Sequence, residues 1–297
     1  MEALRTPDDR FDGLPGWSFR PHYLDDLPGF EGLRVHHADE GEGERTFLCL
    51  HGQPTWAYLY RKMIPILARE GRVIAPDWLG MGRSDKPVDD DAYGFHFHRD
   101  MMLALVERLD LRRITLVVQD WGGLIGLTLP MEAPERYERL IVMNTALATG
   151  RSPGEGFEAW RAYSNANPDL DVAALMKRAV PALSGAEAEA YAAPFPDVRH
   201  KAAVRRFPRM VMTSPEMEGV ETSKRAVGFW RDEWAGESFM AIGAQDPVLG
   251  PDTMERMRTL IRGCPEPLVL SDVGHFVQEA GDQVAEAALA HFAKRGG

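Results

Sequence analysis

The chain is predicted to adopt an α/β fold, in which a mostly parallel central sheet is flanked by helices. Short, almost continuously apolar runs alternate with segments whose apolar residues recur at helical spacing. Strands that are apolar on both faces are typical of a parallel sheet, because the crossover helices cover both of its faces. The chain has 297 residues, of which 44% are hydrophobic and 27% charged, and this suits a globular protein with a sizeable core.

Six apolar runs are predicted to form the strands of this sheet. In chain order they cover residues 46–50, 72–77, 114–119, 139–144, 238–243 and 267–272. Residues 17–40 differ from these apolar runs, and we expect them to form an antiparallel hairpin that leads into the sheet. The helical spacing predicts covering helices over residues 98–109, 253–261 and 283–295.

The alternation of strands and helices is interrupted between about residues 150 and 214. This stretch contains the helical patterns GEGFEAWRAYSNA, DVAALMKRAV and GAEAEAYAA, and it contains no strand candidate. Open α/β sheets bind ligands beyond the carboxyl ends of their strands, so helices inserted after a strand are placed to cover that site. We therefore predict a core formed by residues 1–149 and 215–297, with a helical cap formed by residues 150–214.

Charge and composition exclude several classes of function. The net charge is −11, with 45 acidic and 34 basic side chains, which argues against nucleic acid or an anionic membrane as a partner. No apolar run approaches the roughly 18 residues that a membrane span requires, and the first residues do not resemble a secretory signal. Cys49 and Cys264 provide no disulfide framework, and His96 and His98 lack a third ligand at a recognisable spacing. We expect a cytoplasmic monomer without metal or cofactor.

A carboxylate stands at a sharp strand-to-helix turn in the sequence LVVQDWGG. In a nucleophile elbow, such a turn lifts one side chain above the edge of the sheet and requires small neighbours. Gly122 and Gly123 supply them, although Val118 is larger than the glycine usual on the strand side. A serine hydrolase would carry serine at the position of Asp120. Taken alone, the stretch also fits a helix with Asp120 as its N-cap.

Two more residues follow Asp120 in the order, acid and then histidine, that is used by hydrolases with this turn. Asp246 follows the predicted strand 238–243, and His275 follows the next strand, in SDVGHFVQE. A carboxylate can fix the imidazole tautomer whose second nitrogen accepts a proton. His275 alone could be an ordinary surface or core histidine. In this order, however, the three residues predict a triad of nucleophile, acid and base.

The sequence LHGQPTW, at the end of an early strand, is the third part of the predicted site. In the α/β-hydrolase fold, the loop after this strand provides one backbone N–H of the oxyanion hole, and the residue after the nucleophile provides the other. Gln53 and Trp121 are therefore the expected donors. Without the elbow, the stretch would be a simple turn around its Gly and Pro.

Four motifs together resemble the haloalkane dehalogenases of the α/β-hydrolase fold: HGQPTWAYLYRKMIP, IAPDWLGMGRSDKP, LVVQDWGG and GHFVQE. The resemblance runs from GWSFRP to the last predicted helix. It is closest to subfamily I, which is typified by the dehalogenase that acts on 1,2-dichloroethane. Two features indicate this subfamily. The acid falls late, as Asp246, while Asn144 occupies the earlier alternative position, and Gln53 replaces an Asn that holds halide in another subfamily.

The resemblance implies hydrolysis of short haloalkanes to alcohol, halide and a proton, through an alkyl ester on Asp120. It implies that the indoles of Trp121 and Trp160 hold the halide, and that the haloalkane, water and halide are the partners. The expected pocket residues are Phe157, Phe207, Pro208, Leu124, Val248 and Leu249. Leu124 and Ala179 replace larger aromatic residues of the resembling relative, and the segment between residues 147 and 157 is shorter, so the substrate range is left open.

Two alternative functions fit parts of the pattern. An epoxide hydrolase shares the fold and the Asp nucleophile, but it needs a pair of cap tyrosines that protonate the epoxide oxygen. The cap offers Tyr163 and Tyr191, which stand outside the context that such enzymes show. A non-enzymatic receptor with this fold would be expected to have a broken triad, whereas all three members are present here.

Overall fold

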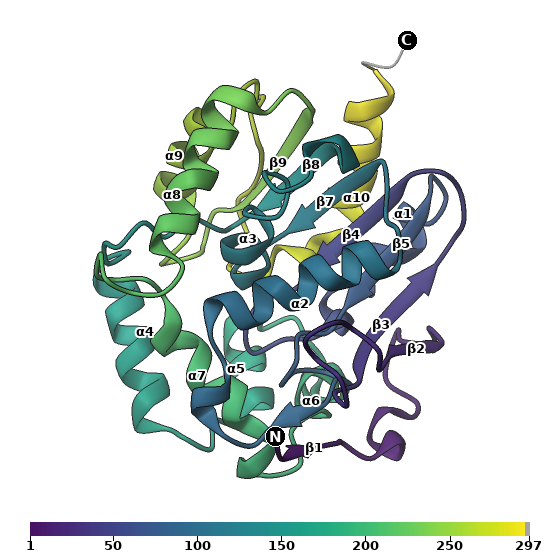
Figure 1. The fold of residues 1–297 in the computed structure, drawn as a ribbon, viewed down its shortest axis with the longest axis vertical. Helices are drawn as coiled ribbons and strands as arrows, with labels where there is room; N and C mark the ends of the chain where they lie inside the picture. Colours follow the sequence, from purple (N-terminus) through teal and green to yellow (C-terminus); the bar gives the residue numbers. More distant parts are fainter. Residues whose placement is uncertain (295–297) are drawn as a thin grey trace.

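An eight-stranded sheet forms the centre of the computed structural model, which describes residues 1–294 (Figure 1). The strand order is β10-β9-β8-β7-β4-β5-β3-β2, and every neighbouring pair from β10 to β5 is parallel. The strands are β2 (Pro21–Leu24), β3 (Val35–Glu40), β4 (Thr46–Leu50), β5 (Arg72–Pro76), β7 (Ile114–Val118), β8 (Tyr137–Met143), β9 (Glu237–Gly243) and β10 (Leu268–Leu270). The predicted mostly parallel α/β sheet is confirmed.

Each of the six predicted apolar runs forms a strand. The run 267–272 is the most shortened, because the chain turns after Leu270 and the Val273 N–H donates to the Leu270 carbonyl at 3.3 Å. The expected hairpin is also present, since β2 pairs antiparallel with β3, which pairs antiparallel with β5. A separate two-stranded sheet joins β1 (Ala3–Leu4) to β6 (Lys86–Pro87).

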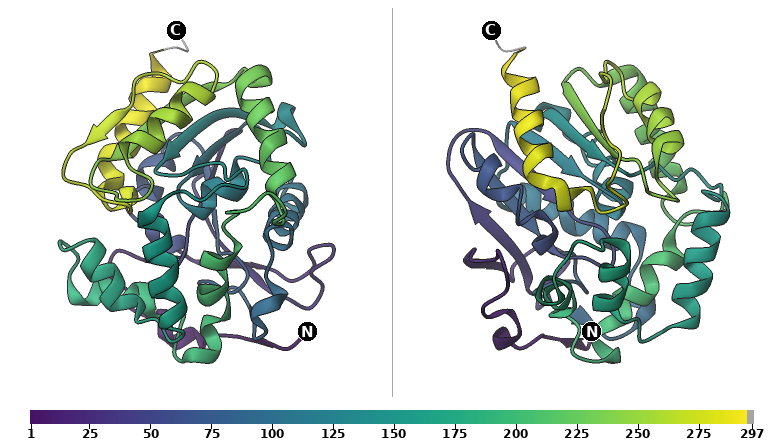
Figure 2. Two further views of the ribbon diagram at one scale, coloured as in Figure 1. Left: turned by 90° about the vertical axis from the view of Figure 1, so that its left-hand side faces the viewer. Right: turned by 180° about the vertical axis from the view of Figure 1, so that it is seen from behind.

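Helices cover both faces of the sheet. In Figure 1, α2 (Phe95–Arg108) and α3 (Trp121–Gly126) lie in front of the sheet, and the view from behind in Figure 2 places α10 (Gly281–Ala293) in front. The remaining core helices are α1 (Ile64–Leu67), α8 (Val220–Gly228) and α9 (Pro251–Leu260). The three predicted helices are present, and residue 295 of the predicted range 283–295 lies outside the described residues. Within residues 1–294, no helix combines the length and apolar character that crossing a membrane requires.

Four helices follow β8 before the chain reaches α8 and returns to the sheet at β9. They are α4 (Glu155–Ala166), α5 (Val172–Ala179), α6 (Gly185–Ala192) and α7 (Ala202–Met210), and they lie together at one end of the sheet (Figures 1 and 2). Side chains begin two of these helices: Asp171 accepts from the Ala174 N–H, and Ser184 forms a capping box with Glu187. We propose that this helical layer is the cap of residues 150–214, with residues 1–149 and 215–297 as the core.

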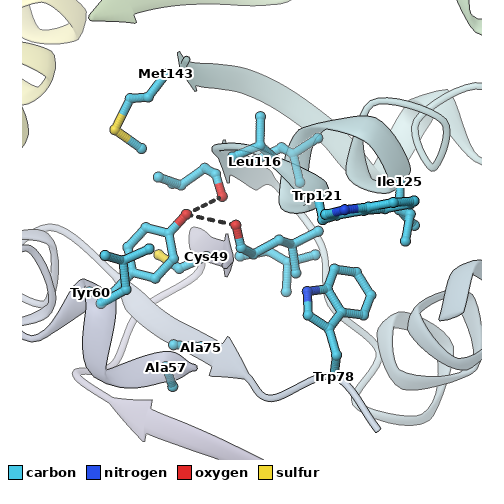
Figure 3. Close-up of a cluster of buried hydrophobic side chains, with 14 of the residues drawn as sticks. Cys49, Ala57, Tyr60, Ala75, Trp78, Leu116, Trp121, Ile125 and Met143 are labelled. Carbon is cyan, nitrogen blue, oxygen red and sulfur yellow. Dashed lines mark hydrogen bonds between the residues drawn. The ribbon is translucent and has the colours of Figure 1, made fainter. Parts of the chain in front are cut away.

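A buried phenol joins the two strands that lead into the predicted site (Figure 3). The Tyr60 hydroxyl lies 2.8 Å from the carbonyl oxygen of Leu50 and 3.2 Å from that of Val117. Leu50 ends β4 and Val117 is near the end of β7, and a buried hydroxyl needs such partners. Tyr60 thereby ties the carboxyl ends of β4 and β7 together, directly before the loop with Gln53 and the turn with Asp120.

Candidate active site

Asp120 stands at the turn between β7 and α3. Its backbone has φ 51° and ψ −126°, a conformation that costs a non-glycine residue about 1–3 kcal/mol. The turn is fastened to the end of β8, because the Asp120 N–H donates to the Asn144 carbonyl at 3.0 Å and the Thr145 hydroxyl donates to the Asp120 carbonyl at 2.7 Å. The Asp120 carboxylate makes no capping hydrogen bond to the helix. Asp120 thus occupies the N-cap position of α3, but its side chain does not cap the helix and is available for another role.

Glycines let three segments approach one another at this turn. A Cβ atom on Gly122 would collide with the carbonyl oxygen of Leu50, and one on Gly123 would collide with the Thr145 side chain. A Cβ atom on Gly52 would collide with the carboxylate of Asp120. The glycines of HGQP and DWGG thus allow the Gln53 loop, the elbow and the end of β8 to come into contact.

The other two residues of the predicted triad meet at the carboxyl ends of β9 and β10. Nδ1 of His275 lies 2.7 Å from Oδ2 of Asp246. The side chain of Asn144 donates to the same oxygen at 3.0 Å, while the N–H groups of Val248 and Leu249 donate to Oδ1 at 2.9 and 3.0 Å. Both carboxylate oxygens of Asp246 accept hydrogen bonds, so the carboxylate is held in one orientation against the imidazole.

The second ring nitrogen of His275 has two neighbours. Nε2 lies 3.5 Å from Oδ2 of Asp120 and 3.0 Å from the side-chain nitrogen of Gln119. That nitrogen also donates to the His275 carbonyl at 3.0 Å, and because a carbonyl oxygen only accepts, the amide orientation is fixed. Gln119 is fully buried, and its Oε1 has no partner among the described residues. The sequence reasoning missed Gln119, although its position directly before the nucleophile was a signal.

The pKa values of the imidazole and its acid move in opposite directions. Burial disfavours the charged ring, but the charge of Asp246 and the hydrogen bonds with Asp120 and Asp246 outweigh it and raise the pKa of His275 to about 10. Burial acts to raise the pKa of Asp246, but the charge and hydrogen bond of His275 and the Asn144 amide hold it well below its usual range. Both shifts favour a protonated ring beside an ionised Asp246.

One of the two expected oxyanion-hole donors already contacts the carboxylate. The backbone N–H of Gln53 donates to Oδ1 of Asp120 at 2.9 Å. The Gln53 side chain points elsewhere and donates to the Val204 carbonyl on α7 at 2.9 Å. Trp121 begins α3, where backbone N–H groups lack a partner within the helix. No hydrogen bond from its N–H to the carboxylate occurs among the described residues.

A cavity of about 890 Å³ lies above Asp120 between the helical layer and the sheet. Asp120, Trp121 and His275 line its inner end, and Trp160 of α4 lines it from the helical layer. Five of the six expected pocket residues also line it: Phe157, Pro208, Leu124, Val248 and Leu249. The structure thus brings the triad, both expected halide-binding tryptophans and most of the expected pocket to one cavity.

Phe207 is the exception, because it does not line the cavity. Its ring is fully buried between Trp121 and His98, at centroid distances of 4.9 and 4.7 Å. Successive helical residues point about 100° apart, so the neighbouring Pro208 faces the cavity instead. Phe207 supports the Trp121 ring from behind.

Six of the seven tryptophans fall into two kinds by the partner of the indole N–H group, while Trp17 packs in the core and does not line the cavity. Trp56, Trp78, Trp230 and Trp234 donate to acceptors within the protein, and these residues pack in the core. Neither Trp121 nor Trp160 has such an acceptor within residues 1–294, and both line the cavity. Phe195, Trp230 and Trp234 are buried aromatic residues that do not line it. The cavity therefore has two indole donors available beside a carboxylate.

Some residues of the cavity had no signal in the sequence. The wall includes Leu147, Leu175, Val211 and Phe276, and the outer end includes Arg151, Arg178 and Arg256. Several of these residues lie in loops or at helix ends, where no periodicity shows which way a side chain points.

Comparisons with known proteins agree with this geometry. Residues 45–282 match the family model of the alpha/beta hydrolase fold. The chain is 43% identical to the haloalkane dehalogenase of Psychrobacter cryohalolentis, with 96% of each chain covered. It is 40% identical to that of Mycolicibacterium paratuberculosis, with 97% of this chain and 98% of the relative covered.

A solved structure is similar over nearly the whole chain. The haloalkane dehalogenase DpaA from Paraglaciecola agarilytica superposes with a TM-score of 0.96 at 50% identity, and 98% of each chain is covered. That protein is described as tetrameric, so the expectation that this chain is a monomer gains no support and stays a prediction. On the strength of its sequence and fold, this chain belongs to the haloalkane dehalogenases, a family with the α/β-hydrolase fold.

Proposed function

We propose that this protein hydrolyses the carbon–halogen bond of short haloalkanes through an alkyl ester on Asp120. The observation that carries the proposal is the pair of cavity-lining indoles, Trp121 and Trp160, whose N–H groups have no protein acceptor within residues 1–294. Trp121 is adjacent in sequence to the carboxylate, so a leaving anion could be received next to the nucleophile. Membership of the dehalogenase family supports the same chemistry.

In the first step, Asp120 displaces the halide. Its Oδ1 is engaged by the Gln53 N–H at 2.9 Å, which leaves Oδ2 to attack the halogen-bearing carbon. A carbon–oxygen bond forms, and the carbon–halogen bond breaks with its electron pair leaving on the halide. The indole N–H groups of Trp121 and Trp160 stabilise the charge that develops on the halide in the apolar cavity.

In the second step, water hydrolyses the ester. Formation of the ester removes the negative charge of Asp120, which is one of the causes of the raised pKa of His275. The neutral ring then takes a proton from water, while the hydroxide oxygen attacks the Asp120 carboxyl carbon. The Gln53 and Trp121 N–H groups receive the oxyanion, and Asp246 stabilises the imidazolium. The products are the alcohol, a halide ion and a proton.

The environment of the cap tyrosines favours a dehalogenase over an epoxide hydrolase. Tyr163 is 40% exposed, and the Tyr191 hydroxyl is buried and donates to Glu279. No tyrosine is among the described residues that line the cavity. An epoxide bound near Asp120 would therefore lack the phenol donors that its oxygen requires.

We further propose that the chain belongs to subfamily I, which the dehalogenase acting on 1,2-dichloroethane typifies. The support is that the acid follows β9, where Asp246 contacts His275, and that Asn144 after β8 donates to this acid. The Gln53 amide is turned toward Val204, so the second halide donor comes from Trp160 in this proposal.

The test is to follow bromide and proton release from 1,2-dibromoethane, beside diol formation from styrene oxide. We expect equal amounts of bromide and proton from the first compound and no diol from the second. Diol without bromide would contradict the proposal and favour the epoxide hydrolase.

A further inference from the structure

Three arginines lie at the outer end of the active-site cavity: Arg151, Arg178 and Arg256. Arg151 is in the segment between β8 and α4, Arg178 is near the end of α5, and Arg256 is on α9. All three are exposed to solvent although they line the cavity, which places them where the cavity meets solvent. We refer to these three residues as the arginine rim.

The arginine rim has no carboxylate partner. Within residues 1–294, no Asp or Glu oxygen lies within salt-bridge distance, 4.0 Å, of Arg151, Arg178 or Arg256. Arg256 donates to the Thr253 hydroxyl at 2.9 Å, and the Arg178 guanidinium lies 5.0 Å from the centroid of the Tyr163 ring. Most other described arginines are paired, and the exceptions away from the cavity are Arg10, Arg20, Arg209 and Arg262. The cavity thus carries three cations without a carboxylate partner on a protein with a net charge of −11.

Few acidic side chains line the cavity together with the arginine rim. Among the described residues that line the cavity, the only acidic side chains are Asp120 and Asp246 at its inner end and Asp272. Asp272 already accepts from the Ser271 hydroxyl at 2.6 Å. Between the two ends, the walls are apolar and include Leu147, Leu175 and Leu260. A molecule that fits has an apolar chain with a halogen at one end and an anionic group at the other.

We propose that the preferred substrates are ω-haloalkanoates, which carry a carboxylate at the end opposite to the halogen. The halogen lies between Trp121 and Trp160, and the carboxylate lies among the guanidinium groups of the arginine rim. Guanidinium binds carboxylate through two parallel hydrogen bonds. A volume of about 890 Å³ is typical of cavities that hold much larger ligands than a dihaloethane. The reaction converts the haloalkanoate and water into the hydroxyalkanoate, halide and a proton.

This inference rests on the proposed function, and the expected preference for a substrate with a carboxylate can be bounded. Exposed ion pairs are individually weak and are screened by salt, so three of them together give a preference of about five- to tenfold in kcat/KM. A basic opening also steers anions toward the cavity, and this contribution too decreases with ionic strength.

The test compares 6-bromohexanoate with its methyl ester, which removes the charge and keeps the chain, while bromide release is measured. Shorter and longer homologues show which chain length spans the cavity. The wild-type protein should prefer the acid, and about 0.5 M salt should reduce the preference because it shortens the Debye length. The variant R151Q/R178Q/R256Q should lose the preference and still turn over 1-bromobutane. Arg20→Gln removes an exposed, unpaired arginine that does not line the cavity, and it should leave the preference intact.

The outcomes separate this inference from the proposed function. If the wild-type protein releases bromide from 1-bromobutane but treats the ester as well as the acid, the ω-haloalkanoate assignment is overturned and the dehalogenase remains. Retention of the acid preference in the triple variant also overturns it. If 1-bromobutane releases no bromide, the proposed function fails, and the inference fails with it.

Discussion

Gln119 and Asp120 compete for the same nitrogen of His275. The Gln119 amide nitrogen lies 3.0 Å from Nε2, and Oδ2 of Asp120 lies 3.5 Å from it. The amide nitrogen can only donate, so it favours a neutral ring with a lone pair on Nε2. The carboxylate favours a protonated ring. The ester removes the charge of Asp120, and after that the contact with Gln119 favours the form of His275 that can act as a base.

Gln119→Leu should therefore raise the pH at which the enzyme reaches half of its maximal turnover. A hydrogen bond is worth about 1 kcal/mol, which corresponds to about 0.7 pH units. The rate of the first, single release of halide should change little, because displacement does not need the neutral ring. Rapid-quench bromide measurements across pH separate the two steps.

Gln278→Leu is the matched control for this variant. Gln278 is also fully buried and follows His275 closely in the chain, but it makes no hydrogen bond to the imidazole in the described structure. Both polar atoms of its side chain lack a hydrogen-bond partner among the described residues, so its replacement should not shift the pH profile. An equal shift in both variants would show that Gln119 acts only through the stability of the fold.

Trp160→Phe should weaken bromide binding by about 10- to 100-fold, because one bond to a charged group is worth about 1.5–3 kcal/mol. The substitution retains most of the aromatic bulk and removes the N–H donor. Quenching of tryptophan fluorescence by bromide measures the affinity. Trp234→Phe is the control, since its indole donates to Ser238 at 3.0 Å and does not line the cavity. Unchanged affinity in Trp160→Phe would make Trp160 a packing residue.

The pH dependence of stability should report the pairing of His275. Its pKa of about 10 lies above the value of about 6.5 for an unfolded histidine. The folded state binds the proton more tightly, so this contribution is complete below about pH 6.5 and is lost as pH rises through about 10. His275→Phe should therefore lose less unfolding free energy than the wild type between pH 7 and pH 10. The unfolding free energy is measured with urea at each pH. An equal change with pH in the two proteins would contradict this prediction.

The sequence predicts the parts of the site that local rules determine. The chain order of Asp120, Asp246 and His275 and the glycines after the elbow were sufficient, because each residue follows a recognisable strand or turn. Phe207 and Pro208 could not be told apart in this way, since the packing of α7 against Trp121 decides which one faces the cavity.

Other features depend on segments that are distant in the chain. The role of Gln119 requires the ends of β7 and β10 to place an amide against one imidazole, a contact between residues 156 positions apart. The arginine rim likewise combines a loop, the end of α5 and α9, and no local pattern in the sequence connects them.

The division of roles between Asp120 and His275 is the central claim, and mass spectrometry of His275→Phe after incubation with 1,2-dibromoethane tests it most directly. Displacement requires only the carboxylate, but hydrolysis of the ester requires the base. The variant should release about one bromide per active site and then stop, and the peptide containing Asp120 should carry the bromoethyl group. The double variant with Asp120→Ala should carry none. Continued turnover by His275→Phe, or an alkyl group on any other residue, would contradict the account.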